Sequence, residues 1–167
     1  MIYQFSVYLH ILSAIIWVGG MLFLALVVVP ATRAMDPAER GALISALGRR
    51  FRVIGWLCIV LLLATGAVNA GYRGVTLGGL FTAPFLESAF GRTLLAKLAL
   101  VALLILLSAL HDFVIGPRWS RARRQRDPEA QRLAARLRWR AATLGRMNTL
   151  LALLIVALAV LLVRPLG

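Results

Sequence analysis

The sequence is poor in acidic residues, cysteine and histidine, and these shortages limit the kinds of function that the protein can have. Aspartate and glutamate number 6 against 19 lysines and arginines, which leaves a net charge of +13. The single cysteine, Cys58, cannot form an intrachain disulfide, so cysteine usage does not indicate the compartment. His-rich and Met-rich tracts are missing. We find no Walker loop, Gly-x-Ser-x-Gly elbow or zinc-protease pattern, which disfavours nucleotide and hydrolase chemistry.

Apolar residues are abundant instead, at 61% of the chain. They fall into four long blocks, and a bilayer-spanning helix needs about 20 mostly apolar residues. Backbone groups in lipid must be satisfied internally, which favours helices. We therefore predict an all-α integral membrane protein, a four-transmembrane-helix bundle forming one domain over 1–167. The helices are expected at about 3–29, 38–70, 93–115 and 129–163. The first is expected to be a retained helix, because MIYQF lacks the basic start of a signal peptide.

The arginines predict the topology. Arginines crowd the first and third connections, with ten of them between Arg118 and Arg146, whereas the middle connection holds only Arg73 and Arg92. Because basic loops stay cytoplasmic, we expect a multi-pass protein of the bacterial inner membrane with periplasmic N and C termini. We interpret the run RWSRARRQR as a topology signal that attracts anionic lipid headgroups, and not as a nucleic-acid site.

Both basic connections contain an Asp-Pro pair, Asp36-Pro37 and Asp127-Pro128. Aspartate at the N-cap followed by proline marks a helix start, so the second and fourth helices should begin outside the bilayer. The shared features suggest two duplicated hairpins. Small residues such as Gly19 allow close packing within the bundle or in a homodimer.

Polar residues share one face of each helix at helical spacing. In the first helix these are Ser6, His10, Ser13, Trp17 and Gly20, and in the second they are Cys58, Thr65 and Asn69. In the third they are Lys97, Ser108 and His111, with Asp112 adjacent, and the fourth contributes Met147 and Asn148. Ionisable groups inside a membrane are costly and mark functional sites. A satisfied buried imidazole and a Lys97 that reaches the headgroups are the structural alternatives.

The two histidines are expected at different depths. At 1.5 Å per residue, they differ in height by roughly 15–20 Å, which is too far for one metal ion. We expect an outer group of His10, Asn69 and Lys97, with Met1 nearby. The inner group comprises His111, Asp112, Met147 and Asn148. Histidine with methionine suits copper, with a polar path past Ser13, Thr65 and Ser108 between the groups.

The sequence resembles the copper resistance protein D (CopD) family of bacterial inner-membrane proteins. The resemblance rests on LHILSAIIWVGGMLFLALVVVP at 9–30, RRFRVIGWLCIVLLLATGAVNA at 49–70 and FGRTLLAKLALVALLILLSALHDF at 90–113. His10 and His111 match the histidines of that family's first and third helices. The resemblance implies copper passage or copper homeostasis.

The chain is more distantly similar to HemJ-type protoporphyrinogen oxidases, which bind haem b. The matching residues are His10, Lys97 and His111. That resemblance implies His10 as a ligand of the haem iron and Lys97 as a partner of the propionates. Three functions therefore stay open: a non-catalytic copper-handling protein, which we favour, a haem-dependent oxidoreductase, and a membrane scaffold or assembly factor.

Overall fold

The computed structural model describes residues 1–125 and 127–163. These residues form helices and their connections, with no strand among them. Four helices are long and apolar enough to cross a membrane, which confirms the all-α membrane fold: Ile2–Ala34, Pro37–Tyr72, Ala89–Arg124 and Pro128–Val163. The chain divides into two compact units, Met1–Glu87 and Ser88–Gly167, and each is described by itself. The single domain over 1–167 stays a prediction.

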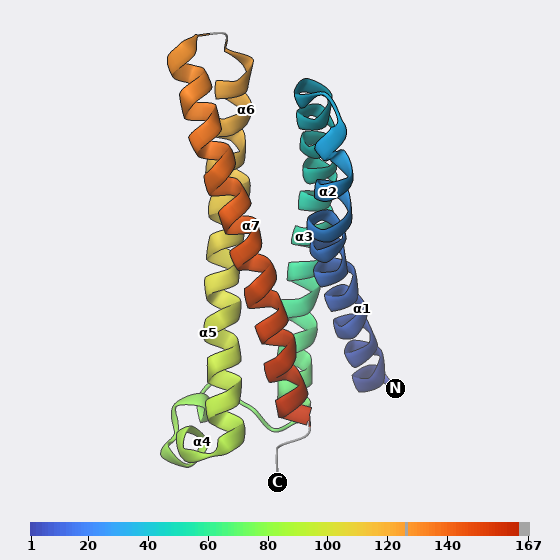
Figure 1. Ribbon diagram of the computed structural model, residues 1–167. Helices are drawn as coiled ribbons and strands as arrows, with labels where there is room; N and C mark the ends of the chain where they lie inside the picture. Colours follow the sequence, from blue (N-terminus) through green and yellow to red (C-terminus); the bar gives the residue numbers. More distant parts are fainter. Residues whose placement is uncertain (126, 164–167) are drawn as a thin grey trace. The chain divides into compact units, whose positions relative to one another are not determined.

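The first unit is an antiparallel hairpin in which α1 packs against α3 (Figure 1). The first membrane-crossing helix comprises α1 (Ile2–Phe23), a π-helical turn at Leu24–Val28, α2 (Val29–Ala31) and a 3-10 turn at Thr32–Ala34. It is followed by α3, which runs without a break from Pro37 to Tyr72. A 3-10 turn at Gly79–Phe81 and the short α4 (Ala83–Glu87) complete the unit.

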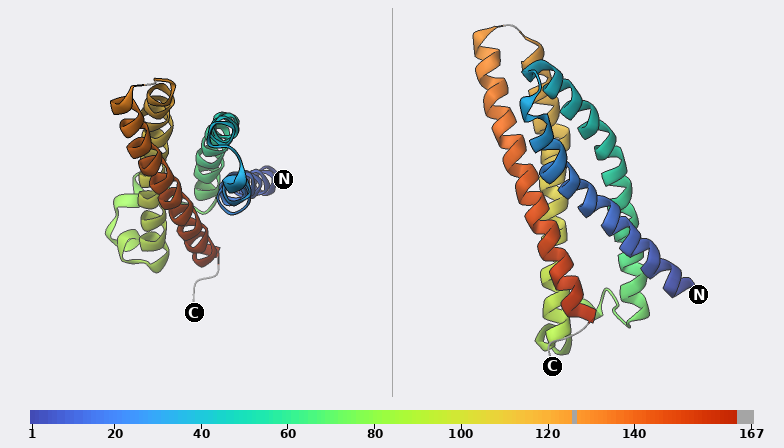
Figure 2. Two further views of the ribbon diagram at one scale, coloured as in Figure 1. Left: turned by 45° about the horizontal axis from the view of Figure 1, so that its top comes forward. Right: turned by 45° about the vertical axis from the view of Figure 1, so that its right-hand side comes forward.

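The second unit is a hairpin of the same kind, with α5 and α6 packed against α7. Its first helix comprises α5 (Ala89–Ala109), a π-helical segment at Leu110–Ile115 and α6 (Gly116–Arg124). Its second helix is α7, Pro128–Val163. In both views of Figure 2 the two arms of this hairpin lie together at the end where α6 meets the start of α7, and in the left view they separate toward the C-terminal end of α7.

The expected aspartate caps are confirmed. Oδ1 of Asp36 accepts from the backbone N–H of Ala38 at 2.8 Å, with Pro37 as the first helical residue. Oδ2 of Asp127 accepts from the N–H of Ala130 at 3.1 Å. Each cap satisfies an N–H that the first helical turn leaves unpaired. The Asp-Pro pairs therefore fix where α3 and α7 begin.

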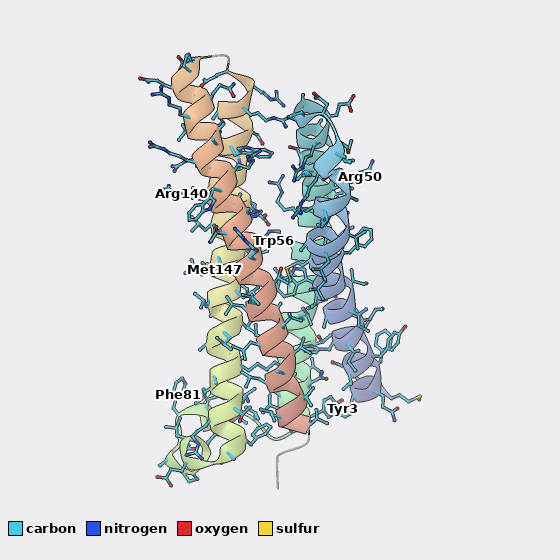
Figure 3. The ribbon with its side chains drawn as sticks, in the orientation of Figure 1. Tyr3, Arg50, Trp56, Phe81, Arg140 and Met147 are labelled. Atoms are coloured by element: carbon cyan, nitrogen blue, oxygen red, sulfur yellow. The ribbon has the colours of Figure 1, made fainter. Side chains whose placement is uncertain are left out.

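The first and third helices extend further into the arginine-rich connections than the bounds expected from the sequence. The first helix continues past Val29 to Ala34, and the third continues past Ile115 through the arginines of α6 to Arg124. A helix of 36 residues such as α3 or α7 is about 54 Å long, whereas the hydrocarbon core is about 30 Å thick. Each hairpin therefore projects its arginine-rich end beyond the hydrocarbon. Figure 3 shows Arg50 and Arg140, each toward the Asp-Pro end of its own hairpin.

A π-helical segment followed by proline occurs in the first helix of both hairpins. The segment Leu24–Val28 precedes Pro30, and Leu110–Ile115 precedes Pro117. Proline has no N–H and its ring clashes with the carbonyl one turn earlier, so a widened turn accommodates it. The same number of residues separates Ile2 from Pro30 and Ala89 from Pro117. This correspondence supports the predicted duplication of a hairpin.

Within the first hairpin, glycine sets how closely α1 and α3 approach. A Cβ atom added at Gly20 would overlap the ring of Phe51 on α3, whereas one added at Gly19 would meet nothing within 4 Å. Most of the large aliphatic side chains on the outside of the hairpin are exposed, as lipid-facing residues should be. The seam between the two helices is thus specified by small residues.

We predict that Gly20→Val destabilises the protein, because the added methyl groups must displace Phe51. Overpacking of this kind costs about 1–3 kcal/mol. Gly19→Val is the matched control, since it introduces the same β-branched residue into the same helix turn without a clash. Thermal unfolding of the two variants in detergent measures the difference. Equal midpoints for the two variants would contradict the close approach at Gly20.

Candidate functional site

The expected polar face of α1 packs against α3. Ser6 and Ser13 are buried, at 8% and 3% exposure. A Cβ at Gly55 would lie 3.4 Å from the Trp17 ring, and one at Gly66 would lie 3.4 Å from Cε1 of His10. The glycines of α3 therefore make room for the large rings of α1, and the His10 ring lies within the seam.

The hydrogen bonds around His10 determine its tautomer. Nδ1 of His10 lies 2.8 Å from Oγ1 of Thr65, and that hydroxyl donates its only proton to the carbonyl of Leu61 at 2.6 Å. A hydroxyl that donates to the Leu61 carbonyl accepts from His10, and in that arrangement Nδ1 carries the ring proton. In the neutral imidazole the lone pair is consequently on Nε2, the nitrogen that can bind a metal. A partner that fixes the ring in this way is typical of metal-binding histidines.

His10 lies inside the first membrane-crossing helix, near the N-terminal end of α1. The rings of Tyr3 and Tyr72 meet at a tilt, with their centroids 5.2 Å apart, where α1 begins and α3 ends, and tyrosine prefers the membrane interface. At 1.5 Å per residue, His10 lies about 10 Å further along α1 than Tyr3. This is deep enough that an uncompensated polar ring would be costly, which accounts for the seam position of His10.

The other residues of the expected outer group are divided between the units. Asn69 lies on α3, one turn from Thr65 toward the end of the helix, and its Oδ1 is buried with no hydrogen-bond partner. Met1 caps the start of α1 and is fully exposed. Lys97 is part-buried on α5 and belongs to the second unit. The structure thus connects His10 with Thr65, and it leaves the grouping with Lys97 as a prediction.

In the second hairpin, His111 is paired with its neighbour Asp112. Nδ1 of His111 lies 2.9 Å from Oδ1 of Asp112, and their side chains are 36% and 20% exposed. The carboxylate accepts a hydrogen bond from Nδ1–H, which again places the lone pair of a neutral ring on Nε2. Both residues lie in the π-helical segment Leu110–Ile115, and such segments concentrate at functional sites.

One turn away from His111, α5 and α7 are joined by a polar contact. Nδ2 of Asn148 donates to Oγ of Ser108 at 3.0 Å, and both residues are buried. This pair therefore fixes the register of the second hairpin. The neighbouring Met147, part-way along α7 in Figure 3, is 45% exposed and lies outside this seam.

Among residues 1–125 and 127–163, no group of three or more histidine, cysteine or acidic side chains could hold a metal ion. Cys58 is buried and forms no disulfide. Each hairpin instead offers one imidazole with a bound Nδ1. The hydrogen bond from His10 to Thr65 was not anticipated, although Thr65 was placed on the polar side of its helix.

Comparison with known proteins relates this arrangement to a family. The sequence model of the family described as copper resistance protein D matches residues 45–162. The chain belongs to the CopD family. It is a multi-pass membrane protein related to copper resistance.

A second match covers nearly the whole chain. An uncharacterized protein of Aquifex aeolicus (strain VF5) is 31% identical over 158 residues, which cover 94% of this chain and 92% of that protein. No solved structure matches the chain.

We predict that Thr65→Val releases the His10 tautomer. Valine has the shape of threonine but cannot accept the Nδ1 proton, so the neutral ring should populate both tautomers. The ¹⁵N chemical shifts of labelled histidine distinguish Nδ1–H from Nε2–H. Thr149→Val is the control, because the Thr149 hydroxyl bonds to the Gly145 carbonyl of its own helix. An unchanged His10 spectrum in Thr65→Val would refute the assigned proton position.

Proposed function

We propose that the protein handles copper in the bacterial inner membrane, either in passage across it or in copper homeostasis. Cuprous ion binds Nε2 of His10 near the terminal end of the first hairpin and Nε2 of His111 near the arginine-rich end of the second. The hydrogen bond from His10 to Thr65 is the observation that carries the proposal, because it presents a ligand nitrogen inside the span. Membership of the CopD family supplies the choice of metal.

The charge distribution supports an assignment of each site to one side of the membrane. The arginine-rich ends of both hairpins should be cytoplasmic, so the termini lie in the periplasm. His10 would then face the periplasmic side and His111 the cytoplasmic side. Positions along their own helices separate the two imidazoles by roughly 15–20 Å in depth. One ion cannot bind both, so the proposal requires two sites used in turn.

The two supporting groups act differently on the metal. The neutral Thr65 hydroxyl orients His10 without adding charge, whereas Asp112 places a carboxylate beside His111. A cation moving toward the cytoplasmic side therefore meets a site with an acidic side chain next to its imidazole. Lys97 would weaken cation binding if its ammonium lay near the path, and we propose that it extends to the outer headgroups.

Copper binding by purified full-length protein tests the proposal. We expect His10→Ala and His111→Ala each to lose one Cu(I) equivalent, because each removes a separate ligand nitrogen. Thr65→Val should retain the site with about 10–100-fold weaker affinity, as expected when the group that orients a ligand is removed. Titration against a chelator of known Cu(I) affinity gives these values.

Thr149→Val is the matched control, and Met147→Leu tests the methionine that the sequence predicted as a copper ligand. Met147 is exposed on α7 and lies outside the seam, so its replacement should alter the Cu(I) affinity far less than that of either histidine. Wild-type protein that takes up no Cu(I), or histidine variants that bind it as well as wild type, would rule out the copper proposal.

The haem alternative uses the same nitrogen. Nε2 of a His10 ring fixed by Thr65 would also suit the axial position of haem iron. We favour copper, because the family match is to copper resistance protein D. A strong Soret band in the protein as isolated, lost in His10→Ala, would establish haem instead. Wild-type protein that binds neither haem nor copper would favour a scaffold.

A further inference from the structure

The contact between Ser108 and Asn148 leaves one buried polar atom unsatisfied. Asn148 is 7% exposed and gives Nδ2 to Oγ of Ser108, while its Oδ1 has no hydrogen-bond partner among the described residues. A buried amide oxygen with no partner is unfavourable, so such an atom in a folded protein calls for an explanation. An oxygen acceptor is satisfied by a proton donor or by a cation.

The polar atom that Asn148 contacts is also an oxygen. Oγ of Ser108 accepts from Asn148 and has a second lone pair. Asp112 follows Ser108 by one helical turn, and its side chain is 20% exposed. One oxygen of that carboxylate accepts from His111, and the group brings a negative charge to this side of α5. The π-helical segment starts just after Ser108, at Leu110, so the backbone here departs from α-helical geometry.

We propose that Asn148, Ser108 and Asp112 bind an alkali-metal cation within the second hairpin. Amide, hydroxyl and carboxylate oxygens suit hard cations, whereas cuprous ion prefers nitrogen and sulfur. A single carboxylate balances one positive charge, so a monovalent ion is favoured over calcium or magnesium. Backbone carbonyls in irregular membrane helices serve the same purpose in transporters that bind sodium.

The positive charge closest along α7 is held away from this position. Arg146 lies on the same helix as Asn148, but its Nε donates to the carbonyl of Ala142 at 3.2 Å and its Nη2 reaches Oγ1 of Thr143 at 3.4 Å. Both bonds draw the guanidinium toward the arginine-rich end of the helix. The distance between like charges is thereby increased, which lowers the repulsion that a bound cation would meet.

This site does not depend on the copper proposal, because its ligands are oxygens and its test needs no copper. Full-length protein in detergent is unfolded by heat in sodium chloride, potassium chloride or choline chloride at equal ionic strength. We expect a saturable rise of the unfolding midpoint in sodium or in potassium relative to choline, since a cation that binds only the folded state stabilises it. Whichever ion gives the larger shift is the preferred ligand.

Variants assign that shift to the site. Asn148→Leu and Ser108→Ala should abolish it or raise the half-saturating cation concentration about tenfold or more, as the loss of a bond to a charged group implies. Asn148→Asp keeps an oxygen and should retain the shift, which covers the case that the leucine variant folds poorly. Thr149→Val, with its hydroxyl bonded within α7, should behave as wild type. Equal wild-type midpoints in the three salts, or a full shift in Ser108→Ala, would overturn the proposal.

Discussion

The hydrocarbon interior supplies no water, so every polar group that enters it must find its partner within the protein. This constraint explains the placement of the polar side chains in both hairpins. Ser6, His10 and Ser13 lie along the surface of α1 that meets α3, and Ser108 meets Asn148 between α5 and α7. The aliphatic residues occupy the outside. The two helices of each hairpin are therefore joined by polar contacts as well as by close packing.

The same constraint explains how the His10 ring comes to have a nitrogen suited to metal binding. Thr65 donates to the Leu61 carbonyl of its own helix, as a hydroxyl in an apolar helix commonly does. With its proton committed, the hydroxyl accepts from His10, and the neutral imidazole keeps its lone pair on Nε2. The hydrogen bond to Thr65 therefore has two consequences: it gives the buried His10 ring a polar partner, and it leaves Nε2 as the nitrogen that suits a metal.

The sequence was sufficient for the helices, and it was insufficient for the contacts between them. Asp36-Pro37 and Asp127-Pro128 signal helix starts through local chemistry, which needs no tertiary information. The arginine segment after Pro117 was judged by its polarity and assigned to a loop. Arginine and alanine are good helix formers, however, and Ala122 packs in the seam with α7. The pairing of His10 with Thr65 depends on the register of two helices, which the contacts at Gly20, Gly55 and Gly66 set and a single sequence does not show.

The repeated hairpin gives an internal comparison for the candidate site. The same number of residues separates Ile2 from His10 and Ala89 from Lys97, and the same number separates Pro37 from Thr65 and Pro128 from Val156. The second hairpin therefore has lysine in place of the imidazole and valine in place of the hydroxyl. Both members of the pair differ together, as expected if Thr65 serves the ring of His10 and not only the packing of α3. The imidazole of the second hairpin instead lies further along its helix and is paired with Asp112. The imidazoles of the two halves therefore have different partners, a hydroxyl for His10 and a carboxylate for His111.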